Sequence, residues 1–275
     1  MKKKLFILLL TSSLGFKCFA CTGWATINSN GDILITKNRD FIPSNEFIEA
    51  RHPKDKFSYL GLFAMNKKNK KQLKAGINEK NLVITSLNAS VLPRSEKHGE
   101  DKGIMAKILS QYSTVQQIYN DKDILFSNAH PEFYMLADKK NIAYVEIAPN
   151  HKFSFILKDK GILTHTNHYL DNNLLAYNEK KYPSSHIRFT RINELLDEKK
   201  DNFSLSDFKN FADDRLHSPN NSIWRTSADN YHERTVATWI VSIPHEGSSP
   251  YIYIKLAAPN ANGTIIQGAL AELLK

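Results

Sequence analysis

The chain has 275 residues, of which 41% are hydrophobic and 24% are charged, and both values are ordinary for a globular protein. They exclude a wholly disordered, collagen-like or coiled-coil chain, and the length fits one large domain or two small ones. The net charge of +9 includes Lys2, Lys3, Lys4 and Lys17 of the first 20 residues, so the remaining excess is too modest to indicate a nucleic-acid-binding surface.

Residues 1–20 are the first segment with a recognisable pattern. A basic stretch ends at Lys4, an apolar run continues to Phe16, and the small residues Cys18 and Ala20 precede a cleavage point after Ala20. This order is typical of a secretory signal peptide, and the apolar run is short for a membrane span. We therefore predict a signal peptide, export to the periplasm or the medium of a bacterium, and a mature chain without an integral membrane span.

Cleavage after Ala20 leaves Cys21 as the first residue of the mature chain. Because the sequence has two cysteines and Cys18 leaves with the leader, the exported domain has no internal disulfide. An α-amine has a pKa of about 7.7–8.0, so its neutral fraction near pH 7 can act as the base for a thiol on the same residue. This is the chemistry of an N-terminal nucleophile. The alternatives are an N-terminal helix that anchors the chain in a membrane and a lipoprotein signal that places a lipid on Cys21.

The mature chain, residues 21–275, alternates predicted strands with a few helices, and we expect one α+β domain. Asn30-Gly31 is a hairpin turn, and the lysine-rich run 67–71 is expected at the tip of another hairpin. Strands are predicted at 23–28, 32–36, 82–87, 133–137, 142–147, 153–157, 162–166, 236–243 and 251–256, with 153–157 and 162–166 forming a pair. Helices are predicted over 103–112, from Ser113 with Gln116 in the capping-box position, and over 187–196.

Metal and cofactor motifs are not found in this sequence. A phosphate-binding glycine loop, a GxSxG nucleophile elbow and an HExxH zinc motif are all missing. His165 and His168 lie three residues apart, but at a predicted strand end and without a carboxylate or cysteine at matching spacing. We expect neither a metal nor a cofactor.

Several short segments, in order along the chain, resemble one enzyme group. The opening Cys21-Thr22-Gly23, Asn30-Gly31-Asp32 and Lys37-Asn38-Arg39-Asp40-Phe41 is similar to that of the cholylglycine hydrolase and penicillin V acylase family and of the related acyl-CoA:6-aminopenicillanate acyltransferase peptidases. Residues 75–82, 86–88, 185–191 and 234–238 resemble later family segments, and His165-Thr166-Asn167-His168-Tyr169-Leu170 favours the acyltransferase-like branch. The resemblance implies a four-layer αββα sandwich of two antiparallel sheets, the N-terminal-nucleophile (Ntn) hydrolase fold.

The resemblance also implies catalytic roles. Cys21 would supply the sulfur nucleophile and the α-amine base, and Asp40 would hold that amine. Asn167 would donate its side-chain amide to the oxyanion, and Asn88 its backbone N–H. Arg188 would lie near the sulfur, favour the thiolate and steady Asp40. The alternatives are an ordinary buried ion pair for Asp40, turn chemistry for the two asparagines and a surface position for Arg188.

Two departures from the family pattern affect the expected substrate and processing. Bile-salt hydrolases and penicillin V acylases carry an arginine where this chain has Lys37, and a lysine cannot supply a planar bidentate fork. We therefore do not expect Lys37 to be catalytic, nor bile salts to be the substrate. The acyltransferases carry a long segment that they remove autocatalytically, whereas only the leader precedes Cys21 here, so we expect signal peptidase to expose it.

We predict an amidohydrolase that cleaves linear non-peptide C–N amide bonds of small N-acyl substrates through a thioester. An acyltransferase that passes the acyl group to an amine, and a lipid-anchored protein without enzymatic activity, are the alternatives. Penicillin V-like amides, N-acyl homoserine lactones, N-acyl amino acids and bile conjugates are all candidate substrates, and a homo-oligomer is left open. Apolar residues of 41–74 suit either an acyl pocket or strand packing: Phe47, Phe57, Tyr59, Leu60, Leu62, Phe63 and Met65.

Overall fold

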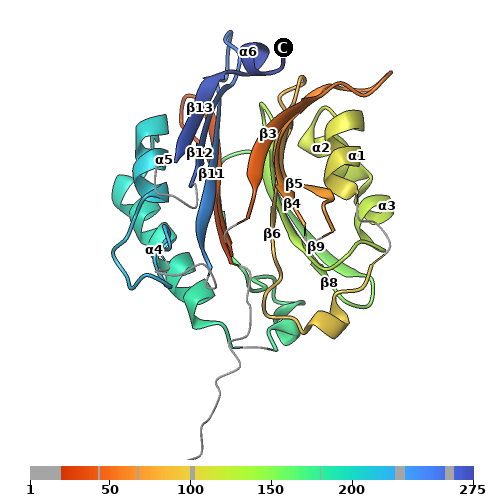
Figure 1. Cartoon of the computed structure of the whole chain (residues 1–275), viewed down its shortest axis with the longest axis vertical. Helices are drawn as coiled ribbons and strands as arrows, with labels where there is room; N and C mark the ends of the chain where they lie inside the picture. The colour runs from red at the N-terminus through yellow and green to blue at the C-terminus, as the bar shows by residue number, and fades with distance from the viewer. Residues whose placement is uncertain are drawn as a thin grey trace, which may run out of the picture.

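Two antiparallel sheets face each other, and helices cover the outer face of each sheet (Figure 1). The computed structural model describes residues 20–42, 44–66, 68–99, 103–179, 181–226, 233–257 and 263–275. The predicted α+β class and the αββα order of layers are confirmed.

The six-stranded sheet carries the N-terminal hairpin at its centre. Its strand order is β10 (Gly161–His165), β1 (Cys21–Ile27), β2 (Ile33–Phe41), β11 (Arg234–Ile243), β12 (Tyr251–Leu256) and β13 (Thr264–Ala269). The predicted turn at Asn30-Gly31 joins β1 to β2, and Gly31 adopts a φ of 86° that a glycine reaches without strain.

The seven-stranded sheet is a meander in chain order. It consists of β3 (Glu46–Arg51), β4 (Tyr59–Met65), β5 (Lys71–Asn78), β6 (Val83–Leu87), β7 (Phe133–Ala137), β8 (Ile142–Ala148) and β9 (Lys152–Lys158). The hairpin expected around 67–71 joins β4 to β5, although Lys67 itself lies outside the described residues.

Three apolar clusters hold the layers together. Between the sheets, Ala25 and Ile35 pack with Leu62 and Ile77 of the opposite sheet. Outside the six-stranded sheet lie α4 (Pro183–Lys199) and α5 (Leu205–Ala212), and outside the seven-stranded sheet lie α1 (Ile104–Gln111), α2 (Val115–Asn120) and α3 (Lys122–Phe126). The short α6 (Leu270–Leu273) and two 3-10 turns, Arg94–Glu96 and Leu175–Tyr177, complete the described elements.

The aromatic residues expected near an acyl pocket divide between two layers. Leu60 and Leu62 belong to the cluster between the sheets, whereas Phe47, Tyr59 and Phe63 pack on the helical side of the seven-stranded sheet. The division follows from the alternation of side chains along β4. The larger rings of this stretch therefore serve strand and helix packing.

Two local predictions are wrong. The strands predicted over 153–157 and 162–166 do not pair, because β9 pairs with β8 while β10 pairs with β1 of the other sheet. The link between them crosses from one sheet to the other. The capping box of α2 uses Thr114 and Gln117 in place of Ser113 and Gln116, which turns Val115 and Ile118 inward.

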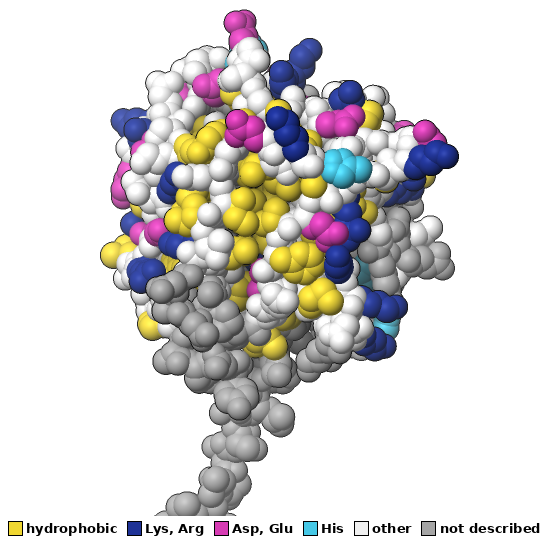
Figure 2. Space-filling model, turned by 45° about the horizontal axis from the view of Figure 1, so that its top comes forward, with side chains coloured by type: hydrophobic (Ala, Val, Ile, Leu, Met, Phe, Trp, Pro, Cys, Tyr) yellow, Lys and Arg dark blue, Asp and Glu magenta, His cyan; other side chains and the backbone are white. Residues whose placement is uncertain are grey.

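At the end of the sandwich opposite Cys21, apolar side chains reach the surface. Ile48 and Ala50 of β3, Ile266 of β13, and Leu273 and Leu274 are half-buried against the core between the sheets. Figure 2, in which the upper end of Figure 1 comes forward, shows hydrophobic side chains gathered on this face.

Residues 1–19 lie outside the described residues, so the signal peptide, its removal and export stay predictions. Within the described part of the chain, no helix combines the length and the apolar character that a membrane crossing requires.

Candidate active site

Cys21 is the first residue of β1 and directly follows Ala20, the first residue that the structure describes. It pairs across the sheet with Arg39, and its side chain belongs to the cluster between the sheets with only 4% of its surface exposed. Ala20 is also buried, and its carbonyl accepts a hydrogen bond of 3.0 Å from the Asp40 N–H. Because Ala20 is still attached, the nitrogen of Cys21 is a peptide N–H.

Asn167 links that nitrogen to the opposite sheet. The Cys21 N–H donates to Asn167 Oδ1 over 2.8 Å, and Asn167 Nδ2 donates to the carbonyl of Asn88, just beyond β6, over 2.9 Å. Its backbone N–H donates to Ser185 Oγ of α4 over 2.8 Å. Asn167 and Asn88 thus meet beside Cys21, and it is the carbonyl of Asn88 that contacts Asn167.

Arg188 approaches Cys21 from the helical layer. It lies on the buried face of α4, one turn after Ser184 and one turn before Ile192, and is fully enclosed. Its Nη1 donates to the Cys21 carbonyl over 2.6 Å and to Thr22 Oγ1 over 2.7 Å. Its Nη2 donates to Asn167 Oδ1 over 2.8 Å. The surface alternative for Arg188 is therefore wrong.

Asp40 lies near this group but has other partners. Thr235 Oγ1 donates to Asp40 Oδ1 over 2.7 Å, and Arg225 Nη1 lies 3.8 Å from Oδ2, which accepts no hydrogen bond from the described residues. Burial raises the pKa of Asp40, opposed chiefly by the charge of Arg225 and then by Arg188. The contact between Asp40 and a free α-amine stays a prediction, because the nitrogen is a peptide N–H here and binds Asn167.

Arg225 and Glu233 extend the charged group around Asp40. Arg225 Nη1 donates to Glu233 Oε2 over 2.8 Å, and burial raises the pKa of Glu233 to about 7. Sequence reasoning did not find either residue, since each is a single charge without a motif around it.

Lys37 is, after Arg225, the second cation near the site to which the sequence assigned no role. It pairs across the sheet with Gly23, two residues from Cys21, so it points into the same space between the sheets. Its ammonium donates to the carbonyl of Lys74 over 2.9 Å and to that of Ser86. Burial lowers the pKa of Lys37 to about 8, although the charge of Cys21 opposes this shift.

The two histidines of the site segment hold the loop that carries Asn167. His165 Nε2 lies 2.8 Å from a Glu146 carboxylate that also accepts the Leu170 N–H. His168 Nδ1 lies 2.7 Å from Ser185 Oγ, and burial lowers the pKa of His168 to about 3, so the ring stays neutral. Within the described ranges, no group of three or more His, Cys, Asp or Glu side chains is placed to hold a metal.

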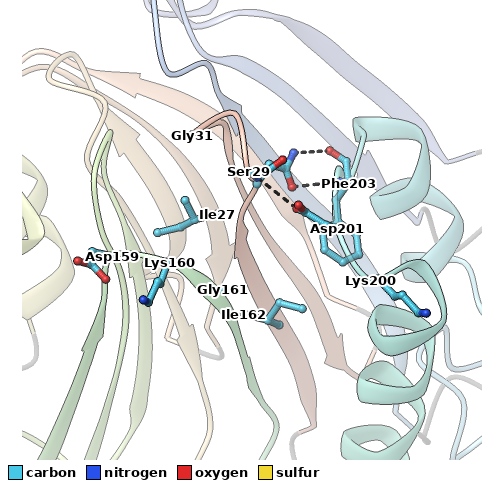
Figure 3. Close-up of a pocket in the computed structure, with 11 residues that line it drawn as sticks. Ile27, Ser29, Gly31, Asp159, Lys160, Gly161, Ile162, Lys200, Asp201 and Phe203 are labelled. Carbon is cyan, nitrogen blue, oxygen red and sulfur yellow. Dashed lines mark hydrogen bonds between the residues drawn. The ribbon is translucent and has the colours of Figure 1, made fainter.

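A separate pocket of about 580 Å³ lies at the other end of β1. Ile27, Ser29 and Gly31 line it together with Lys160 and Asp201 (Figure 3). None of the residues around Cys21 contributes to it, so it is distinct from the candidate active site.

Comparisons with known proteins agree with the family resemblance and with the fold. A family model described as acyl-coenzyme A:6-aminopenicillanic acid acyl-transferase matches residues 26–258. No curated protein matches the chain. Among solved structures, a variant of conjugated bile acid hydrolase from Clostridium perfringens matches with a TM-score of 0.62 and 16% identity, covering 93% of this chain and 94% of that chain. At this identity the likeness shows the fold alone, and the fold is that of the Ntn hydrolases.

Proposed function

The chain belongs to the acyl-coenzyme A:6-aminopenicillanic acid acyl-transferase family, and from this premise we propose that it is an exported N-terminal cysteine amidohydrolase. It would cleave linear non-peptide amide bonds of small N-acyl substrates through a thioester on Cys21. The observation that supports this most is the convergence of Asn167 and Arg188 on Cys21, because one amide oxygen accepts from both the Cys21 N–H and the guanidinium.

Removal of residues 1–20 creates the catalytic base. The peptide N–H of Cys21 is not basic, whereas an α-amine with a pKa of about 7.7–8.0 takes up the thiol proton near neutral pH. Asn167 Oδ1 already accepts from this nitrogen, so it would orient the amine toward Sγ. The Asp40 carboxylate would neutralise the ammonium that forms.

Asn167 would next stabilise the tetrahedral intermediate. An amide nitrogen carries two hydrogens, and Asn167 Nδ2 uses one for the carbonyl of Asn88. The second would donate to the oxyanion that forms when Sγ attacks the acyl carbon. The loss of a donor of this kind typically raises the barrier by about 2.7–4 kcal/mol.

The ammonium then returns its proton to the leaving nitrogen, and the thioester remains. Water attacks the thioester carbon while the α-amine takes one of its protons. The C–S bond then breaks, the carboxylic acid leaves, and the ammonium returns the proton to Sγ. Arg188 would keep the geometry fixed through both steps, because its guanidinium holds the Cys21 carbonyl and Asn167 together. An acyltransferase differs only in the second step, where an amine replaces water, and the family match favours keeping this alternative in the test.

The test begins with the exported protein itself. N-terminal sequencing and intact mass should show a free Cys21 at the start of the chain. The protein should hydrolyse a phenoxyacetyl or medium-chain acyl amide, and product analysis with an added amine separates hydrolysis from transfer. Glyco- and tauro-conjugated bile acids should be poor substrates.

Cys21→Ala supplies the decisive comparison. We expect it to abolish turnover, a loss of at least about 10⁴-fold, with an unchanged circular dichroism spectrum. Normal turnover by this variant, or full activity in a chain that keeps residues before Cys21, would disprove the proposal.

A further inference from the structure

A β-bulge in β5 turns one more lysine toward the space between the sheets that the Cys21 side chain faces. The pairing of β4 with β5 shifts between Leu62–Ala75 and Phe63–Leu73, so Lys74 has no partner on β4. A bulge turns the extra side chain away from the regular alternation of the strand.

The neighbours of Lys74 show to which side it turns. Leu73 packs with the helical layer, and a Cβ on Gly76 would lie 2.5 Å from Leu109 of α1, so both positions face outward. Two residues, Lys74 and Ala75, lie between these outward positions, and Ala75 belongs to the cluster between the sheets. The bulge thus turns Lys74 to the interior, where the charge of Cys21 acts on it.

The Lys74 ammonium is held without a partner. It is half-buried, and it forms no hydrogen bond or ion pair with any residue that the structure describes. Its own carbonyl accepts from Lys37 Nζ over 2.9 Å, which fixes the bulge from the opposite sheet. Burial lowers the pKa of Lys74, as expected for a desolvated cation.

The charges around Lys74 leave an excess of positive charge. Arg39, whose charge also acts on Lys74, forms an enclosed ion pair of 3.2 Å with Glu46. Glu132 is the remaining acidic side chain whose charge acts on Lys74, and it acts on Lys37 as well. The negative charge of a Cys21 thiolate would be balanced in the mature protein by the α-ammonium of the same residue. A desolvated cation without a counter-ion is unfavourable, and an anion that binds beside it removes this penalty.

We propose that Lys74 binds a carboxylate of the substrate and that the protein selects N-acyl amides with a carboxylate near the scissile bond. The surplus of about one positive charge matches a monoanion. A single ammonium suits a carboxylate, whereas phosphate sites favour forked arginine donors or rows of backbone N–H groups. This inference rests on the proposed function, since it names the substrate class of the same site.

A matched pair of substrates tests the proposal. Phenoxyacetyl-glycine and phenoxyacetyl-glycinamide differ in charge and hardly in shape. For Lys74→Met we expect kcat/KM to fall about tenfold or more for the acid, mainly through KM, and to stay within about twofold for the amide. Lys74→Arg should keep the preference for the acid.

The control is Lys71→Met on the same strand. Lys71 is exposed and pairs with Glu49 over 2.8 Å, so both substrates should react as with the wild type. Equal losses for acid and amide in Lys74→Met would overturn the proposal, because they would indicate a purely structural role.

A second readout does not depend on amide hydrolysis. The Cys21 thiolate displaces iodide from iodoacetate, an anion, and from iodoacetamide, which is neutral, and intact mass follows both reactions in the mature protein. Lys74→Met should lower the ratio of the two rates about tenfold, and an unchanged ratio would overturn the anion site. If neither glycine substrate reacts while this ratio falls, the amidohydrolase proposal fails and the anion site stands.

Discussion

The two halves of β2 are equally buried and chemically opposite. Ile33, Leu34 and Ile35 begin the strand, and each has 2% or less of its surface exposed. The second half continues with Lys37, Asn38, Arg39 and Asp40, each with 5% or less exposed. Burial therefore does not distinguish the core half of this strand from the site half. The two halves differ in the kind of partner that their side chains require.

The apolar half needs only contact with neighbouring side chains, whereas each polar side chain needs its own partner. Lys37 has two carbonyls, Arg39 has Glu46, and Asp40 has Thr235. Asn38 donates to the carbonyls of Ala212 and Ile223. Burial of such groups lowers stability unless every partner is present, so the apolar half should carry the stability and the polar half the activity.

Among the variants of β2, Asp40→Asn is expected to show the largest difference between its effect on activity and its effect on stability. An amide cannot neutralise the ammonium of Cys21, so we expect kcat to fall by about 10²–10⁴-fold. Burial raises the pKa of Asp40, so at pH values above the ordinary pKa of an aspartate the ionised carboxylate lowers the stability of the folded chain. Removal of the charge should therefore not lower the melting temperature at pH 7. A large fall in melting temperature with retained kcat would reverse the comparison.

The converse experiment is Ile35→Ala in the apolar half. Ile35 lies between Ala25 and Val241 in the sheet, and its truncation should lower the free energy of unfolding by about 2–5 kcal/mol. Urea denaturation measures this loss. In the folded fraction, kcat/KM should stay within about twofold, and a tenfold fall would show that this half also shapes the site.

Lys37 should make stability depend on alkaline pH. Burial lowers its pKa from 10.5 to about 8, so between these values the unfolded chain holds a proton that the folded chain has lost. The free energy of unfolding therefore rises with pH in this window, by about 2–3 kcal/mol relative to Lys37→Met. Denaturation at pH 8 and pH 10 gives the difference, and Lys71→Met is the control because its ammonium is exposed. If the free energy of unfolding depends on pH in the same way in the wild type and in Lys37→Met, the lowered pKa of Lys37 is contradicted.

The smallest effect is expected for Thr238→Val on β11, the strand that pairs with β2. Thr238 Oγ1 donates to Asn38 Oδ1 over 2.8 Å, and loss of this bond should lower the free energy of unfolding by about 1 kcal/mol. Activity should be unchanged, since Asn38 serves the packing of β2 against the helical layer. Thermal melts with a parallel assay check both expectations.

Local patterns predicted the strands of hairpins well, because a short turn forces its flanking strands to pair. The strands predicted at 23–28 and 32–36 pair around Asn30-Gly31, and the strands predicted at 133–137 and 142–147 pair across a short turn as well. The sequence could not place β9 and β10 in different sheets, since that choice depends on partners far along the chain. It also missed β3, whose half-buried residues lack a clear alternation, and β13 and α5.

The site divides in the same way. Cys21, Asn167 and Arg188 stand in segments that resemble a family, and the structure brings them together. Lys74 and Arg225 are single charges in segments without a motif. A bulge turns Lys74 toward the site, and the neighbouring strand β11 connects Arg225 to Asp40 through Thr235. Neither feature has a signature in the sequence, because a bulge is defined by the register of two strands.

The junction between Ala20 and Cys21 has a consequence for timing. A protease needs an accessible, extended bond, yet Ala20 is enclosed and its carbonyl is paired with the Asp40 N–H. If the leader is removed as we propose, the cut must come before β1 and β2 pair. A molecule that folds before cleavage keeps a peptide N–H in place of the α-amine base, and it stays inactive. The yield of active enzyme then depends on the rate of cleavage relative to the rate of folding.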